Sequence, residues 1–399
     1  MTHSCHKAVI DGFKRRFGEA SELSVFSSPG RVEIGGNHTD HQGGNVLAAA
    51  IDLDILAVAA PSKSLIQIDS EGFGFFTVGL ENLAPLPEEA GTPQALVRGI
   101  CARMQSLGYK TGGFSAFMKS SIPGGSGLSS SAAFSMLVCT ILSQFYSCGT
   151  IHATILAQIA QFAENKYFDK PCGLMDQLAI STGGFTAIDF ADPTNPVIIP
   201  VAFDFSATMH SLCVVNTDAS HADLTEAYAS IPQEMGLVAR AMGKERLADV
   251  SPADFYSRFE SLRGLGNDRA LLRAIHFFDE TQRVKDQTLC LQENRFNDFL
   301  ALVNASGHSS FMNLQNIYPP DSPATQPLAI ALALSGTILG NRGTFRVHGG
   351  GFAGSILAIV PNALLATYQS AMNAALGIQA CRELALRSKG TCFVEKINT

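Results

Sequence analysis

The first half of the chain mixes short apolar runs with glycine-rich turns, a pattern typical of strands. The segment 46–60 is apolar but contains two aspartates that break it, so it predicts a pair of strands. Two shorter runs, 64–70 and 72–78, predict strands joined by the turn EGFG. Another strand is expected over 113–123, where a proline ends it.

Helical patterns occur at the start of the chain and become frequent after the first hundred residues. The opening segment 1–18 is amphipathic and predicts a short helix. A long apolar run within 124–147 predicts a buried helix, and apolar residues recur at helical spacing over 152–168. The apolar segment 327–340 is too short to span a membrane and predicts a further buried helix.

The order of these elements indicates the fold class. Strands come in runs, with helices between and after them, which favours an α+β fold over a doubly wound parallel sheet. A strand at 209–218 is followed by helix-rich sequence, and a last glycine cluster at 345–360 precedes a strand-like run. No linker marks a boundary, and we predict two lobes, 1–197 and 198–399.

Composition narrows the class of protein. The 399 residues include 46% hydrophobic and 16% charged residues, enough to bury a substantial core. The formal net charge of −7 argues against nucleic acid or an anionic membrane as the main partner. No signal peptide is recognisable, and the nine cysteines lack metal-ligand spacing, so we expect reduced thiols and a cytoplasmic location. We also expect a monomer or a weak homodimer.

The most informative stretch is PGGSGLSSSAA at 123–133. Its glycines expose backbone N–H groups, and a helix begins immediately after them, so the stretch predicts a phosphate-binding loop. It matches neither a P-loop nor a dinucleotide fingerprint, and the alternative is a glycine turn with a serine helix cap. We expect ATP to bind through Gly124, Gly125, Ser126, Gly127, Leu128, Ser129 and Ser130.

Four segments together resemble the galactokinases of the GHMP kinase superfamily. PGGSGLSSSAA is similar to the phosphate-binding motif of GHMP kinases. SSPGRVEIGGNHTDHQGG at 27–44 resembles the galactokinase signature, usually Gly-Arg-Val-Asn-Leu-Ile-Gly-Glu-His-Thr-Asp-Tyr-Asn-Gly-Gly. The segments 163–177 and 348–360 resemble the stretch with the catalytic aspartate and the third motif. The resemblance implies a two-lobed GHMP kinase fold, with the active site in the cleft between the lobes.

The resemblance also implies phosphorylation of the anomeric hydroxyl of galactose by ATP, giving galactose 1-phosphate. Asp176 matches the residue proposed as the catalytic base, and Arg31 matches the arginine between that base and the phosphates. An arginine there keeps the carboxylate ionised and offsets charge on the transferred group. Outside these motifs, a helix-cap aspartate and a surface ion pair would be the ordinary interpretations.

Magnesium is the second cofactor that the family implies, because it bridges the phosphates of ATP. Glu164 matches the family's magnesium carboxylate, and Ser131 is expected to supply a hydroxyl ligand. A solvated position on a helix face is the alternative for Glu164. The sequence alone does not decide between a magnesium ligand and a solvated helix position for Glu164.

The resemblance assigns the sugar to Asn37, His38, Asp40, Gly173 and Tyr228. A structural histidine is the alternative for His38, and a half-buried core aromatic is the alternative for Tyr228. A metal site at 38–41 is disfavoured, because the spacing follows no familiar zinc pattern and no second ligand set follows.

Several positions depart from the family pattern. Asn37 stands where galactokinases carry a glutamate that receives the sugar's 6-hydroxyl, and an amide there lacks the charge that would repel a carboxylate. An alternative substrate is therefore a hexuronic acid such as galacturonate. The other departures are His41 for tyrosine, Ile231 and Pro232 for an arginine pair, and His348 and Ala353 for threonine and glycine.

A further alternative is a sugar-sensing regulator without useful turnover. Such regulators are disrupted just after the serine run, whereas Ser131, Ala132 and Ala133 are all present here, as are Arg31 and Asp176. The intact set favours an enzyme. A dehydrogenase is disfavoured, because no ribose-binding acid follows the glycine-rich loops.

Overall fold

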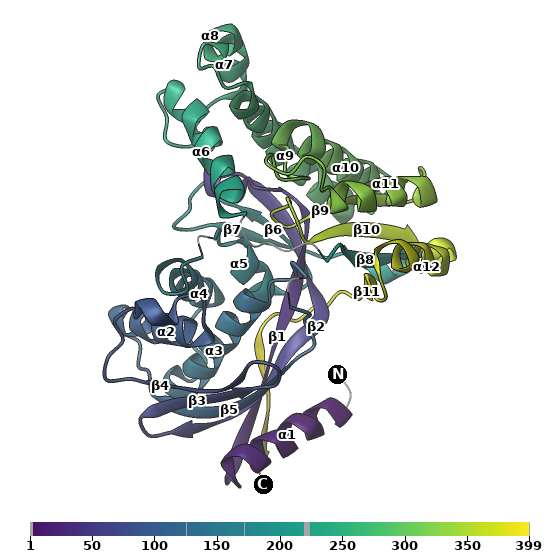
Figure 1. The fold of residues 1–399 in the computed structure, drawn as a ribbon. Helices are drawn as coiled ribbons and strands as arrows, with labels where there is room; N and C mark the ends of the chain where they lie inside the picture. Colours follow the sequence, from purple (N-terminus) through teal and green to yellow (C-terminus); the bar gives the residue numbers. More distant parts are fainter. Residues whose placement is uncertain (1–2, 125, 171, 219–223, 399) are drawn as a thin grey trace.

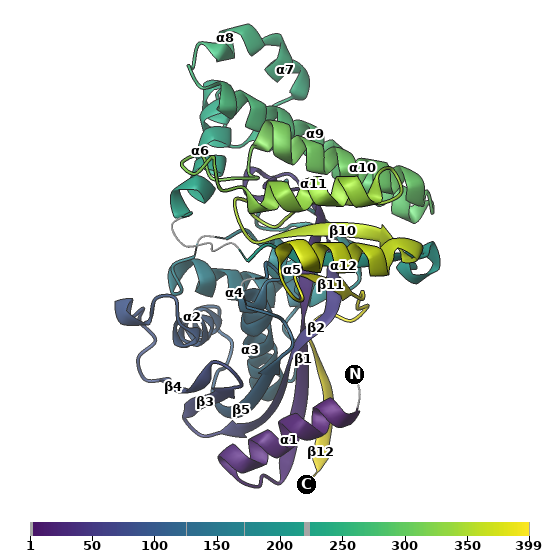
Figure 2. The same ribbon diagram turned by 45° about the vertical axis from the view of Figure 1, so that its right-hand side comes forward.

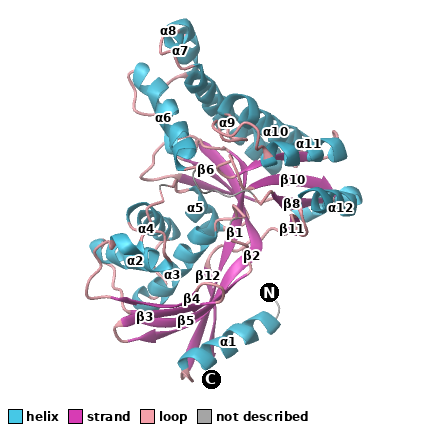
Figure 3. Ribbon diagram, in the orientation of Figure 1, coloured by secondary structure: helices cyan, strands magenta, loops and turns pink. Residues whose placement is uncertain are grey.

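The computed structural model of the protein describes residues 3–124, 126–170, 172–218 and 224–398. It is an α+β structure with two sheets, one in each half of the molecule (Figure 1, Figure 3). The larger sheet has the strand order β12-β1-β2-β5-β3-β4, and β6 pairs with β2 and β7. Its strands are β1 (Glu22–Gly35), β2 (Asn45–Ser62), β3 (Leu65–Ser70), β4 (Gly74–Gly79), β5 (Gly113–Ser120), β6 (Phe185–Asp189), β7 (Val197–Val201) and β12 (Cys392–Asn398).

The smaller sheet has the order β11-β8-β10-β9 and is antiparallel throughout. Figure 2 shows α11 and α12 next to β10, and the two helices contact each other. Both helices contribute to one hydrophobic cluster with this sheet. Its strands are β8 (His210–Asn216), β9 (Thr344–His348), β10 (Ser355–Pro361) and β11 (Cys381–Leu384).

Helices cover both sheets and build the upper half of the molecule in Figure 1. The main core lies between the larger sheet and α2–α5, while α1 packs against the same sheet through a separate small cluster. In the described residues the helices are α1 (His3–Phe17), α2 (Pro93–Ser106), α3 (Ser130–Ser147), α4 (Ala153–Lys166), α5 (Met175–Thr182), α6 (Thr225–Ala241), α7 (Pro252–Ser257), α8 (Phe259–Arg263), α9 (Asp268–Gln292), α10 (Phe296–Ser309), α11 (Pro327–Leu339) and α12 (Leu365–Leu376).

Most predicted elements are confirmed, but the strand pair over 46–60 is wrong. β2 runs through this segment without a break. The two aspartates do not end the strand, because the returning chain satisfies them. Asp52 accepts a hydrogen bond from the backbone N–H of Ala385 at 3.0 Å, and Asp54 pairs with Arg387 at 3.0 Å.

Two other expectations need refinement. α11 was expected to be buried, but Ile330 on this helix is 54% exposed, so only one side of the helix is covered. The larger sheet also takes in β7, which runs across the predicted division between residues 197 and 198, and β12, which falls within the predicted second lobe. The end of the chain returns to pair with β1, because that edge of the sheet would otherwise lack a partner.

No helix in the described ranges combines the length and the apolar character that crossing a membrane requires.

Candidate active site

Three sequence motifs meet at the carboxylate of Asp176. Asp176 lies in the first turn of α5, and the Arg31 Nε on β1 donates to its Oδ1 at 2.7 Å. Ser129, from the glycine-rich loop, donates to the other oxygen, Oδ2. The same Arg31 donates through Nη1 to the carbonyl of Gly127 at 2.7 Å. Arg31 therefore links the glycine-rich loop to Asp176, and the two predicted catalytic residues are in direct contact.

The surroundings keep Asp176 ionised. Burial by itself would raise its pKa, but the Arg31 charge and the hydrogen bonds from Arg31 and Ser129 hold the pKa below its ordinary value. The carboxylate also lies at the start of a helix, where the backbone dipole favours negative charge. Asp176 can therefore orient a hydroxyl group while carrying its full charge.

The glycine-rich loop is shaped by two left-handed residues. Gly127 has φ +73°, which glycine adopts at little cost, and Ser129 has φ +63°, which is uncommon for a residue with a side chain. This turn delivers Ser130 to the first position of α3 and directs the Ser129 hydroxyl to Asp176. Gly125, one of the predicted ATP contacts, lies outside the described residues, while Gly124 has open space on its side-chain face.

Residues of the third motif, on strands β9 and β10 of the smaller sheet, hold this loop in place. Ser355 donates to the carbonyl of Ser126 at 3.0 Å, and the buried His348 contacts Ser355 through Nδ1 at 3.1 Å. The other ring nitrogen of His348, Nε2, accepts the backbone N–H of Glu33 at 3.2 Å. Burial lowers the pKa of His348 well below its ordinary value, so the ring is neutral and links both lobes by hydrogen bonds alone. The sequence showed His348 only as a departure from threonine.

The two predicted magnesium ligands lie together. Ser131 Oγ is 3.4 Å from Glu164 Oε2, and Glu164 is 1% exposed. Burial raises the pKa of Glu164, and Gln177 donates to its second oxygen at 3.2 Å. Lys170 was not predicted and approaches both groups, with its Nζ 3.2 Å from Ser131 Oγ and 3.5 Å from Glu164 Oε2.

A hydroxyl and a carboxylate are the hard oxygen donors that Mg²⁺ prefers, so Ser131 and Glu164 fit the metal chemically. Two protein ligands suffice for an ion that keeps several waters and also binds phosphates. Across the described ranges, no cluster of three or more His, Cys, Asp or Glu side chains is arranged to hold a metal.

The side chain of Asp40 occupies the space beside Gly173. Asp40 begins a short 3₁₀ helix after β1, and Gly173 lies in the loop before α5. A side chain at 173 would place its Cβ 1.6 Å from Asp40 Oδ2, so only glycine leaves room for the carboxylate. Both residues line a cavity of about 370 Å³, together with His41, Gln161, Cys172, Pro232 and Arg246. Burial, and in part the charge of Asp176, raises the pKa of Asp40.

The two histidines of the signature contact each other. His38 Nε2 lies 2.9 Å from the carbonyl of Gly350, so this nitrogen must carry the proton. His38 Nδ1 is then an acceptor and receives the Nε2–H of His41 at 3.2 Å. Burial lowers the pKa of His38 to about 3 and that of His41 to about 4, so both rings are neutral. Protein groups therefore occupy both ring nitrogens of His38.

Tyr228 approaches the same glycine segment from α6. Its hydroxyl donates to the carbonyl of Gly351 at 2.8 Å, and its ring makes an edge contact with Phe352 at 5.4 Å between centroids. A side chain at Gly350 would clash with the tyrosine ring at 2.6 Å. Tyr228 and His38 therefore contact neighbouring residues of the third motif, Gly351 and Gly350.

The side chain of Asn37 is engaged entirely within the protein. Its amide group donates to Glu33 Oε1 at 2.9 Å and to the Gly349 carbonyl at 2.7 Å. Its oxygen accepts from Asn316 at 2.8 Å, and the residue is 1% exposed. Both N–H groups and the oxygen of Asn37 are therefore already used by the protein, which leaves no free polar atom for the predicted sugar contact.

The partner of Asn37, Glu33, was missed by the sequence analysis. Glu33 Oε1 also accepts from Nη2 of Arg346 at 2.9 Å, and Arg346 is completely buried. Burial raises the pKa of Glu33 to about 7, although Arg346 and Arg31 act against this shift. A signal was present, because the usual signature has asparagine at position 33 and glutamate at position 37, the reverse of this chain.

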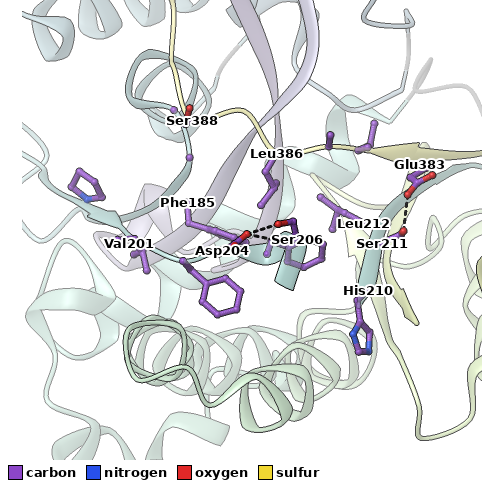
Figure 4. A pocket seen from close by; sticks show the side chains of 18 of the residues that line it. Phe185, Val201, Asp204, Ser206, His210, Ser211, Leu212, Glu383, Leu386 and Ser388 are labelled. Atoms are coloured by element: carbon purple, nitrogen blue, oxygen red, sulfur yellow. Dashed lines mark hydrogen bonds between the residues drawn. The ribbon is translucent and has the colours of Figure 1, made fainter. Parts of the chain in front are cut away.

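A larger cavity, of about 830 Å³, lies elsewhere between the two sheets (Figure 4). Its lining includes Phe185 from the larger sheet and Leu212 from the smaller one, and none of the predicted site residues. The acidic groups on its wall, Asp204 and Glu383, are exposed and accept hydrogen bonds from neighbouring serines at 2.6 Å. The predicted site residues therefore lie away from this cavity.

Comparison with known proteins agrees with this geometry. Residues 11–61 match the family model described as the galactokinase galactose-binding signature, and residues 95–184 match the GHMP kinases N terminal domain. A galactokinase from Glaesserella parasuis is 31% identical over 358 residues, which cover 88% of each chain. The galactokinase of Bos taurus is 31% identical, with 87% of this chain and 86% of that protein covered.

Comparison with solved structures finds the same fold in other kinases. The crystal structure of Lactococcus lactis galactokinase complexed with galactose superposes with a TM-score of 0.81 at 23% identity, covering 98% of this chain and all of the other. A mevalonate kinase superposes with a TM-score of 0.61 at 15% identity and covers 92% of this chain. The matched signature, the shared length and the phosphate loop joined to Asp176 lead to one conclusion: this chain belongs to the galactokinase family of the GHMP kinases.

Proposed function

We propose that this protein phosphorylates the anomeric hydroxyl of galactose with ATP. The observation that carries the proposal is the contact of Arg31 and Ser129 with the two oxygens of Asp176, directly beside the glycine-rich loop. A negatively charged acceptor, a fixed cation and a set of backbone N–H groups are what phosphoryl transfer requires of a protein.

In this proposal Asp176 hydrogen-bonds the attacking hydroxyl and directs its oxygen at the γ-phosphate. The lowered pKa makes Asp176 a weak base. The proton therefore moves to Asp176 only as the new oxygen–phosphorus bond forms and the hydroxyl becomes acidic. Arg31 offsets the charge on the transferred group, and the loop N–H groups at the start of α3 hold the phosphates.

Ser131 and Glu164 would hold Mg²⁺, which neutralises phosphate charge when bound. The ammonium group of Lys170 lies next to Ser131 and Glu164 and adds a positive charge on the side where the phosphates would bind. Glu164 is fixed by Gln177, so its carboxylate keeps one orientation as the nucleotide enters.

For the sugar, we infer that Asp40 and Gly173, which line one cavity, form the binding surface, while His38 and Tyr228 hold the third motif through the carbonyls of Gly350 and Gly351. Asp40 accepts hydrogen bonds from ring hydroxyls, and Gly173 keeps the space that this carboxylate needs. Relatives over most of the chain are galactokinases, and this supports galactose as the sugar.

The galacturonate alternative rested on the loss of one negative charge at position 37. Glu33 keeps a carboxyl group 2.9 Å from the Asn37 amide, so an acidic group is still present there, and both N–H groups of the amide are already used by the protein. A silent regulator is disfavoured, because Arg31, Ser129 and Asp176 form the complete set of contacts that turnover needs.

ADP release by the purified chain with ATP, Mg²⁺ and a panel of sugars tests the proposal. The panel contains galactose, galacturonate, glucose, glucuronate and N-acetylgalactosamine. We expect the highest kcat/KM with galactose. A higher value with galacturonate would overturn the choice of sugar, and no turnover with any sugar would overturn the proposed activity.

We further propose that the protein works as a monomer or a weak homodimer in the cytoplasm. Eight cysteines are free thiols in the structure, and five of them are buried. Reduced thiols of this kind are typical of a reducing compartment. Sedimentation at micromolar concentration, with and without ATP, checks the oligomeric state.

A further inference from the structure

Glu33 lies on the same face of β1 as the catalytic arginine. Arg31, Val32 and Glu33 pair with consecutive residues of β2 without a bulge, so side chains two positions apart point to one side. Arg31 reaches Asp176 from that side, while Val32 points the other way into the core. Glu33 therefore faces the site in which Asp176 and Arg31 meet.

Only one of the two Glu33 oxygens is occupied. Asn37 and Arg346 both donate to Oε1. The other oxygen, Oε2, receives no hydrogen bond from any residue that the structure describes. Oε2 is also not among the unpartnered polar atoms without accessible surface, so it keeps some exposure although Glu33 as a whole is only 3% exposed.

The pair of residues 33 and 37 is exchanged relative to the signature that the chain otherwise matches. The usual galactokinase signature, to which residues 27–44 are similar, has asparagine at the first position and glutamate at the second, whereas this chain has Glu33 and Asn37. The two side chains are in direct contact at 2.9 Å, so the exchange keeps one carboxylate and one amide in the same small volume. It also keeps a carboxylate partner for the buried Arg346.

We propose that Glu33 binds the sugar in this protein, its free oxygen accepting a hydroxyl group of the substrate in place of the carboxylate that the signature carries at position 37. This inference rests on the proposed sugar kinase function. Glu33 is a specificity residue, because a carboxyl oxygen accepts from a hydroxyl but penalises a sugar that lacks the hydroxyl at that position.

The test uses kcat/KM for galactose and for its 2-, 3-, 4- and 6-deoxy analogues. The variant Glu33→Gln keeps the shape and an acceptor for Asn37 and Arg346. The matched control, Glu260→Gln, changes an exposed glutamate far from the site. We expect Glu33→Gln to lower kcat/KM for galactose by about tenfold to a hundredfold, the range for a hydrogen bond to a charged group.

One deoxy analogue should show no loss between the wild-type chain and Glu33→Gln, because the hydroxyl that Glu33 receives is already missing. An equal loss for every analogue would overturn the proposal, since Glu33 would then act only through the packing of Arg346. Calorimetric binding of galactose and the analogues gives the same comparison without turnover. Absence of turnover alone would therefore count against the proposed function and not against Glu33.

The exchange itself supplies a second test. Glu33→Asn leaves Arg346 beside two amides, and Asn37→Glu places two carboxylates in contact, so each single change should lower kcat/KM. The double variant Glu33→Asn/Asn37→Glu restores the signature and should recover most of the loss, a non-additive result. A double variant as impaired as the product of the two single effects would overturn the inference.

Discussion

Two carboxyl groups on neighbouring parts of this site, one half-buried and one buried, differ in acidity, although each is paired with an arginine. The pKa of Asp176 lies below its ordinary value, whereas the pKa of Glu33 is raised to about 7. Donors to Asp176 are spread over both of its oxygens, and its side chain is 23% exposed. Donors to Glu33 share one oxygen, and its side chain is 5% exposed.

The comparison shows that one arginine neighbour does not by itself fix the charge of a buried acid. Removing a carboxylate from water costs several kcal/mol, and the cost is met only when the remaining lone pairs are satisfied. At Asp176, groups of the protein donate to both oxygens. At Glu33, the two donors share Oε1, and in our proposal the sugar supplies the partner of the other oxygen.

The largest expected effect comes from removing the ionised member of the pair. Asp176→Asn should lower kcat by about 10²- to 10⁴-fold, because the amide neither accepts the proton nor offsets Arg31. Single-turnover phosphorylation of galactose measures this loss, with Asp192→Asn on an exposed loop as the control. Near-full turnover of both Asp176→Asn and Asp176→Ala would remove the aspartate from the mechanism.

The second prediction concerns the dependence of stability on pH that follows from the raised pKa of Glu33. The pKa of Glu33 in the folded state is about 7 and its ordinary value is 4.5. The folded state therefore binds the proton more tightly, and ionisation of Glu33 destabilises the fold as pH rises from about 4.5 to about 7. The full shift corresponds to about 3 kcal/mol.

Urea unfolding at pH 5 and pH 8 measures this contribution as the difference between the wild-type chain and Glu33→Gln. The variant removes the titration and leaves Arg346, Arg31 and Asp40 as the charged neighbours of position 33. We expect the free energy of unfolding of the wild-type chain to fall, relative to the variant, between the two pH values. An unchanged difference would mean that Glu33 titrates normally.

A third prediction separates the sugar end from the phosphate end. Gly173→Ala places a methyl group on Asp40 Oδ2, so Asp40 must move. We expect KM for galactose to rise by about tenfold to a hundredfold, since displacement of one contact by an ångström has effects of this size. KM for ATP, measured in the same assays, should change little. An equal rise in both constants would contradict this separation.

The smallest effect is expected at the link between the two ends. His348 joins the backbone of Glu33 to Ser355, which holds the phosphate loop at Ser126. His348→Thr breaks this chain of neutral hydrogen bonds and should raise KM for ATP by about threefold to tenfold. Ser355→Ala removes the next link and should give a similar rise. No change in either variant would show that the loop is held by Arg31 alone.

Much of the site was predictable, because its motifs are short and local. The glycine-rich loop, Asp176, Arg31 and the Ser131–Glu164 pair were identified from the sequence, and the structure brings the members of each group together. The strand break at 46–60 was wrong because a segment more than 300 residues later satisfies its aspartates. The exposed face of α11 was missed, because an apolar helix does not reveal which neighbours cover it.

The sequence by itself determined the family, the phosphate chemistry and the residue types of the site, since these follow from spacing along a few segments. Only the tertiary structure decided which groups are satisfied and which are free. In the folded chain the polar atoms of Asn37 are hydrogen-bonded, one oxygen of Glu33 has no partner among the described residues, and Gly173 leaves space for the carboxylate of Asp40. Such assignments depend on contacts between residues far apart in the chain, and burial, which sets their energies, exists only once those segments have packed.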